Sequence, residues 1–67
     1  MKVPSHATLL LNRNRKYSID QIHFKTGQIT LKESEKVYNT VSIKNVIFDY
    51  SGFSVSEIIN FEKKFYV

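Results

Sequence analysis

The ten residues IHFKTGQITL, which begin at Ile22, constrain the fold most strongly because they have the form of a β-hairpin. Apolar and polar residues alternate on both sides of a threonine–glycine pair, as in half-buried strands. A two-residue turn that ends at Gly27 places Phe24 opposite Ile29. The same register places Ile22 opposite Leu31, on the same face. Pattern and turn chemistry agree, so the sequence predicts an antiparallel hairpin whose apolar face joins the core.

The strand before this turn changes the parity of its apolar residues. Tyr17 and Ile19 share one parity, whereas Ile22 has the other. Such a change within a strand predicts a β-bulge, here near Asp20. A regular register would also set Asp20 opposite Glu33, and a like-charge pair is unfavourable. The bulge would relieve this repulsion.

Further strands are predicted on both sides of the hairpin. Residues 7–12 predict a first strand, and residues 12–16, NRNRK, a loop that follows it. TVSI predicts a fourth strand with Val41 and Ile43 facing inward, KN interrupts the alternation, and VIFDY predicts a fifth strand. The stretch VSIKNVIF resembles the junction between the fourth and fifth strands of SH3-like and Sm-like barrels. This resemblance implies a small barrel that turns a corner at KN.

The C-terminal part of the chain changes to a helical period. Ser54 and Glu57 have the spacing of a capping box, and the apolar residues after them recur at helical intervals. We therefore expect a helix over residues 55–64; a closing strand in FEKKFYV is the alternative, because aromatic residues and valine also favour strands. The predicted fold is mainly β: a small twisted antiparallel sheet, or an SH3/Sm-like partly open barrel, of about five strands with a short C-terminal helix.

A chain of 67 residues is long enough for one domain. We expect a tail over residues 1–5, a sheet over 7–50 and the helix over 55–64. A domain of this size buries only ~60% of the surface of its unfolded chain and often needs an additional stabilising device. Cysteine is absent, so disulfides are excluded. We therefore expect a homodimer or a complex with a host protein that covers the edges of the sheet.

The charge of the chain points to anionic partners. Its formal net charge is +4 and its pI is about 9.5, which favours nucleic acid or acidic protein surfaces. The apolar run ATLLL is shorter than the ~7–15 residues of a signal peptide, so we expect a soluble, cytoplasmic protein that does not bind membranes. Residue types with AT-rich codons far outnumber those with GC-rich codons, which indicates a low-GC host, its phages or its mobile elements.

Two groups of residues are candidate binding sites. The predicted basic loop 12–17 could bind phosphate through its cations and stack its tyrosine on a base; it comprises Arg13, Arg15, Lys16 and Tyr17. The alternative is that this loop is only a soluble connector, since asparagine favours turns. The chain also has five phenylalanines and four tyrosines, more than so small a core can bury. A C-terminal aromatic edge that contacts protein partners could therefore include Phe61, Phe65 and Tyr66.

No catalytic or cofactor-binding pattern is evident. Ser18, Asp20 and His23 lie close in sequence, but adjacency on a strand does not produce the convergent geometry of a catalytic triad. Two histidines without cysteine match no zinc-ligand spacing. So small a domain has little room for a substrate pocket of ~300 Å³ in addition to a core. We expect no enzyme activity, no metal, no cofactor and no small-molecule substrate.

Three functions are consistent with these expectations. The first is a non-enzymatic regulator or inhibitor that acts by protein–protein contact and is encoded by a phage or mobile element of a low-GC host. The second is a small-barrel protein that binds nucleic acid through the basic loop 12–17. The third is a structural subunit of a larger assembly.

Overall fold

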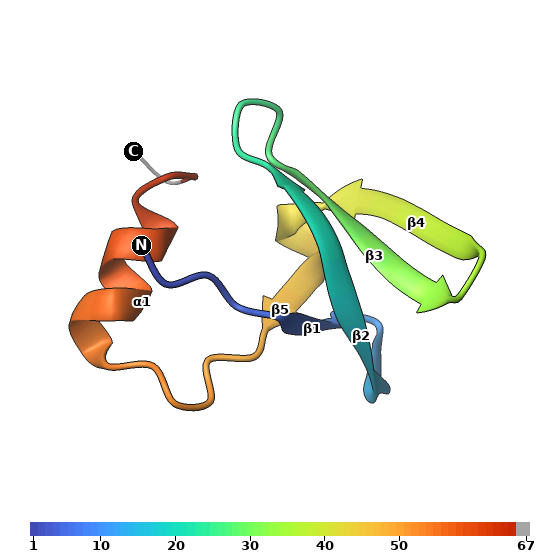
Figure 1. Ribbon diagram of the computed structural model, residues 1–67, viewed down its shortest axis with the longest axis horizontal. Coiled ribbons are helices and arrows are strands. Elements are labelled where there is room, and N and C mark those ends of the chain that lie inside the picture. The colour runs from blue at the N-terminus through green and yellow to red at the C-terminus, as the bar shows by residue number, and fades with distance from the viewer. Residues whose placement is uncertain (66–67) are drawn as a thin grey trace.

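The structure is a computed structural model that describes residues 1–65. Its strands form one open antiparallel sheet in the order β4-β3-β2-β1-β5, with one short helix at the C-terminal end (Figure 1). This confirms the predicted fold class. The elements are β1 (His6–Leu9), β2 (Asn12–His23), β3 (Gln28–Ser34), β4 (Val37–Ser42), the 3-10 helix η1 (Ile43–Asn45), β5 (Val46–Phe48) and α1 (Val55–Glu62).

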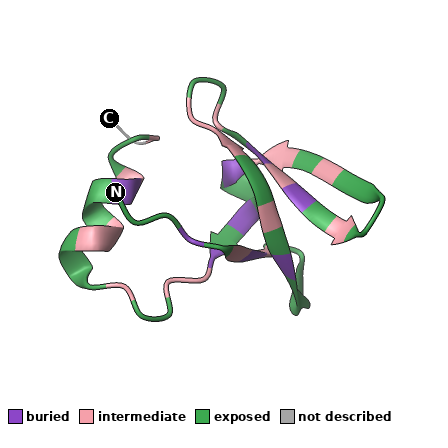
Figure 2. Ribbon diagram, in the orientation of Figure 1, coloured by how far each residue is buried: buried purple, intermediate pink, exposed green. Residues whose placement is uncertain are grey.

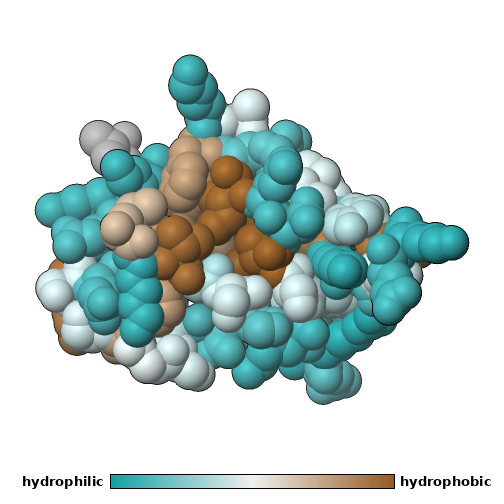
Figure 3. All heavy atoms as spheres, in the orientation of Figure 1, coloured by the Kyte–Doolittle hydropathy of each residue, from teal (hydrophilic) through white to brown (hydrophobic). Residues whose placement is uncertain are grey.

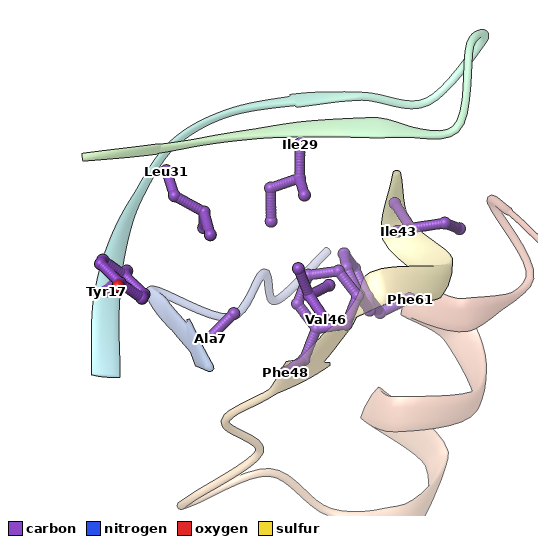
Figure 4. Packing of buried hydrophobic residues seen from close by; sticks show 8 residues of the cluster. All are labelled: Ala7, Tyr17, Ile29, Leu31, Ile43, Val46, Phe48 and Phe61. Carbon is purple, nitrogen blue, oxygen red and sulfur yellow. The ribbon is translucent and has the colours of Figure 1, made fainter. Parts of the chain in front are cut away.

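The long strand β2 joins the two halves of the sheet. Its first part pairs with β1 and its second part pairs with β3, and it curves between them (Figure 1). The sheet therefore folds over itself and encloses the core, in keeping with the strong twist of small sheets. Ile29 and Leu31 of β3 point across this space toward Ala7, Val46 and the helix (Figure 4). The buried core consists of Ala7, Tyr17, Ile29, Leu31, Ile43, Val46, Phe48 and Phe61.

The β2–β3 hairpin is present, but its predicted register is wrong. Ile22 lies opposite Ile29, and His23 lies opposite Gln28, so the turn contains four residues instead of two. The Gly27 N–H donates to the His23 carbonyl at 2.9 Å and closes this turn. Gly27 has a φ of 70°, a backbone conformation that glycine adopts without steric penalty.

Phe24 explains the difference in register. Its ring lies outside the strand pairing and contacts two rings of the C-terminal region: it stacks on Phe65 with centroids 4.9 Å apart and meets Phe61 edge-on at 6.2 Å. Aromatic pairs in such geometry contribute beyond the area they bury. These partners lie far along the chain, so the hairpin sequence gave no indication of them.

The predicted bulge in β2 is confirmed. The register shifts between Ile19 and Gln21, so Asp20 has no partner in β3, while Ile19 lies opposite Leu31. Ile19 and Ile22 therefore face the same side despite their different parity. In the first part of β3, the buried residues Ile29 and Leu31 alternate with residues that are wholly or partly exposed, as a strand with one face in the core requires (Figure 2).

The chain turns between β4 and β5 at the position where the sequence predicted a break, and the sheet remains open. Instead of a simple break, the chain makes the 3-10 helix η1, and the Ser42 hydroxyl caps it by accepting from the Lys44 N–H. Ile43 is buried, and its N–H donates to the Gly27 carbonyl at 3.0 Å. The corner is thereby fixed to the β2–β3 turn.

Helix α1 begins at the predicted capping box. The Ser54 hydroxyl accepts from the Glu57 N–H, and the Glu57 carboxylate accepts from the Ser54 N–H at 2.8 Å. The helix ends at Glu62, two residues earlier than predicted, so Lys63 and Lys64 follow the helix instead of forming its last turn. Phe61 is fully buried and meets Phe48 edge-on at 5.0 Å, which docks α1 on β5.

Residues 1–5, which the sequence predicted as a tail, precede β1 and contact the rest of the chain. Pro4 is buried, and the Lys2 ammonium donates to the Gly52 carbonyl at 2.7 Å and lies 4.7 Å from the centroid of the Phe53 ring. The Ser5 carbonyl accepts from the Ile19 N–H at 2.9 Å.

Apolar surface remains visible between α1 and β2 (Figure 3).

Candidate functional site

The basic segment NRNRK does not form the predicted loop between two strands. β1 ends at Leu9, and the Leu10 N–H donates to the Asn45 carbonyl at 2.8 Å, which continues the register of β1 with β5 by one residue. The chain turns at Leu10 and Leu11, and β2 begins at Asn12. The expected first strand over 7–12 is therefore too long at its C-terminal end. The basic residues form the beginning of the second strand.

Part of the basic segment bulges out of the pairing between β2 and β1. Leu9 lies opposite Asn12 and Thr8 lies opposite Lys16, so the intervening residues 13–15 have no partner in β1. The segment projects at the lower end of β2 in Figure 1. We call this projecting region the β1–β2 tip and define it as Leu10, Leu11, Arg13, Asn14 and Arg15.

Two leucines of the tip are exposed to solvent. Leu11 is 99% exposed and Leu10 is 39% exposed. Sequence reasoning assigned both to a strand and did not identify them as site residues. The run of three leucines carried a partial signal, because successive side chains of a strand point to opposite faces and cannot all be buried on one side.

The cations of the segment differ in their partners. Arg13 Nε donates to the backbone carbonyl of Leu10 at 3.3 Å, which holds the guanidinium at the β1–β2 turn. Arg15 donates to the Glu33 carbonyl and lies 4.7 Å from the centroid of the Tyr17 ring. Arginine has five N–H donors, so both guanidinium groups keep donors for a further acceptor.

Lys16 is paired within the chain. Its ammonium contacts Asp49 Oδ2 at 3.0 Å. Asp49 also accepts from the Ser51 hydroxyl at 2.6 Å and from the Ser51 N–H at 3.1 Å. The Ser51 hydroxyl and then Lys16, through hydrogen bonds to the charged form, hold the pKa of the Asp49 carboxyl well below its usual value. This aspartate therefore stays negative at neutral pH and offsets the Lys16 charge.

Tyr17 is not a surface residue of the site. It lies opposite Ala7, faces inward and is only 6% exposed. The prediction that its ring could stack on a base is therefore wrong, because the parity of β2 directs the ring into the core. Of the predicted basic site, Arg13 and Arg15 belong to the tip, Lys16 is paired with Asp49, and Tyr17 is buried.

The predicted C-terminal aromatic edge is also not a free surface. Phe61 has no exposed area, so it cannot contact a partner. Phe65 is half-buried, and its ring packs on Phe24 and Phe61. Both rings are used in docking the C-terminal region on the sheet. Tyr66 lies outside the described residues.

The polar residues considered for catalysis do not converge. His23 Nε2 is 3.0 Å from the Thr30 hydroxyl, on the outer face of the sheet, and Asp20 is the extra residue of the bulge. Within residues 1–65, no three His, Asp or Glu side chains gather as they would around a metal ion.

An open groove of about 660 Å³ lies beside α1. Its volume exceeds the ~300 Å³ for which the sequence predicted little room. The groove is lined by Met1, Lys2, Glu57, Asn60, Lys63 and Lys64.

Among the residues that the structure describes, no helix combines the length and the apolar composition needed to cross a membrane. Comparison of the chain with protein-family models, with curated proteins and with solved structures finds no match.

Proposed function

We propose that this chain is a non-enzymatic binding protein that regulates or inhibits another protein, and that the β1–β2 tip makes the contact. The observation that carries this proposal is the solvent exposure of Leu10 and Leu11 beside a guanidinium group. Transfer of a fully exposed leucine into a partner's pocket is worth about 1.5–3 kcal/mol. The composition of the chain extends the proposal to a phage or mobile element of a low-GC host as its source.

The tip combines apolar and cationic groups in a way that fits a protein surface. Arginine is enriched at interfaces and among the residues that dominate binding energy. Arg13 lies beside Leu10, so a partner pocket with an apolar floor and a carboxylate at its rim would satisfy both side chains. The tip is also held in place by two paired strands and by the Leu10–Asn45 hydrogen bond, which lowers the entropy cost of binding.

Nucleic-acid binding is less well supported than protein binding. The predicted site comprised three cations and a tyrosine ring that can stack on a base, but Lys16 is paired with Asp49 and Tyr17 is buried. Two arginines remain, and two exposed leucines contribute nothing to phosphate binding. A structural subunit of an assembly would use the same apolar contact, so it differs in the partner and not in the mechanism.

A matched pair of variants tests the proposal. Leu11→Ser removes the most exposed side chain of the tip, and Val55→Ser removes an apolar side chain on α1 that is 73% exposed. Wild type and both variants are immobilised, and the proteins they retain from an extract of the source cells are compared. We expect Leu11→Ser to lose the retained proteins and Val55→Ser to keep them. Equal retention by all three chains would refute a role for the tip.

The nucleic-acid alternative is tested with the same chains. Binding to DNA and RNA is measured over a salt series for wild type and for an Arg13→Ala, Arg15→Ala double variant. The alternative requires salt-dependent binding whose slope falls by ~1 for each phosphate contact removed. Absence of salt-dependent binding in wild type would eliminate it.

A further inference from the structure

We propose that the outer edge of β4 binds an extended acidic segment of a partner protein by β-strand addition. This surface is separate from the β1–β2 tip and goes beyond the function proposed for it. Strand addition uses main-chain hydrogen bonds for affinity and alternate side chains for selectivity.

One side of β4 is unpaired. Pairing with β3 extends from Val37 to Ser42 along the inner side. Within residues 1–65, no other backbone hydrogen bond involves the residues of β4. Figure 1 shows β4 at the margin of the molecule with no element beyond it. In an antiparallel strand, residues alternate between those bonded to the neighbour and those directed outward, so about half of the β4 peptide groups are free to pair.

The β4 edge lacks the features by which sheets usually prevent such pairing. Charged residues, proline, bulges and short length protect edge strands. The sequence of β4, VYNTVS, contains no charged residue and no proline, and the nearby register shift places its extra residue, Glu33, on β3. The other edge strand, β5, has only three residues and is protected by its shortness. The two edges of the sheet therefore differ, and only β4 presents a full-length strand.

The charges at the ends of β4 favour an acidic occupant. Lys44 follows the Ser42 end, and Lys25 lies in the β2–β3 turn that is bonded to Ile43. Neither lysine forms an ion pair in the described part of the chain. At the Val37 end, Lys36 is accompanied by Glu35 in the β3–β4 turn and by Glu33 in β3. A second copy of the chain has the same net charge of +4, so charge repulsion opposes self-association.

The preferred type of strand pairing sets the direction of the added strand. Antiparallel pairing is the more stable arrangement and sets the N-terminal end of the added segment next to Ser42. Its acidic residues would then lie near Lys44, which directly follows the Ser42 end in the chain, and a β-prone stretch would follow toward Val37. The ligand we infer is therefore an extended segment in which acidic residues precede alternating β-branched residues.

Amide hydrogen exchange of the full chain, followed by NMR, distinguishes strand addition from simple charge attraction. The probe is a synthetic peptide of about ten residues, with an acidic N-terminal half and a C-terminal half of alternating threonine and valine. We expect the peptide to protect every second amide of β4, namely those that exchange freely without it. A peptide with the two halves reversed should bind at least about threefold more weakly. Binding without this alternate protection, or equal binding of both peptides, would overturn the proposal.

Matched charge reversals test the acidic preference. Lys44→Glu and Lys63→Glu change the net charge equally, but Lys63 follows α1, which lies on the opposite side of the molecule from β4 (Figure 1). We expect Lys44→Glu to weaken peptide binding about three- to tenfold and Lys63→Glu to leave it nearly unchanged. Equal effects would show nonspecific attraction and refute the site. If sedimentation shows that the chain is a dimer with alternate β4 amides already protected, the occupant is a second copy and the acidic partner is refuted.

Discussion

Removal of the Phe61 side chain tests whether the C-terminal helix is part of the folded core. Phe61 is fully buried and packs edge-on against Phe24, Phe48, Tyr50 and Phe65, with ring centroids 5.0–6.2 Å away. Replacing a buried phenylalanine by alanine costs about 3–5 kcal/mol. At 0.05–0.15 kcal/mol per residue, a chain of this length has a free energy of unfolding of about 3–10 kcal/mol. Phe61→Ala therefore removes a large share of the total stability.

Urea denaturation followed by circular dichroism measures this loss. Ile59→Ala is the control, because Ile59 lies on the same helix but is 48% exposed, and it should cost about 1 kcal/mol or less. Phe61→Leu keeps most of the volume and should fall between the two. If Phe61→Ala and Ile59→Ala lower the free energy of unfolding equally, α1 does not dock through Phe61 and the packing described above is wrong.

Three further substitutions test local features. Gly27→Ala should lower the free energy of unfolding by about 1–2 kcal/mol in thermal or urea denaturation, because φ is 70° at this position. No atom lies within 4 Å of the added Cβ, so the cost is conformational and not steric. An unchanged free energy of unfolding would contradict the turn. Ser54→Ala should cost about 0.5–2 kcal/mol by removing the cap of α1. Ser56→Ala, two residues later in the first turn of the helix, should cost less, and equal losses would contradict the capping box. The pKa of Asp49 is lower in the folded chain than in the unfolded chain, so its contribution to stability is full above the unfolded pKa of ~3.9 and is lost as the pH falls below it. Asp49→Asn should therefore weaken the loss of stability in acid, as measured by denaturation at several pH values, and an unchanged pH profile would contradict this contribution.

Local sequence signals predicted the elements whose determinants lie close together in the chain. The bulge at Asp20 followed from the parity of Ile19 and Ile22, and the start of α1 followed from the spacing of Ser54 and Glu57. Each of these features depends on backbone geometry within a few residues. For this reason both could be predicted without knowledge of the tertiary structure.

Features that depend on distant contacts were predicted less well. The hairpin register was wrong because Phe24 packs on Phe61 and Phe65 instead of pairing with Ile29. The same tertiary packing buries Phe61, which we had expected at a binding edge. Sequence alone could not choose which of nine aromatic residues would fill the core.

The candidate site was predicted in part. The basic segment was identified from its composition, but its placement on a strand was not, because the turn at Leu10 and Leu11 contains none of the residue types that favour turns. Asp49, which neutralises Lys16, is thirty-three residues away in the chain. The exposed leucines were missed because apolar residues in a run are normally assigned to the interior.

Titration calorimetry with a partner retained by the wild-type chain tests the central proposal most directly. The affinity and the heat-capacity change of binding are measured for wild type and Leu11→Ser. If the tip inserts into an apolar pocket, we predict that Leu11→Ser weakens binding by about tenfold or more and makes the heat-capacity change less negative. An unchanged affinity together with an unchanged heat-capacity change would contradict protein binding through the β1–β2 tip.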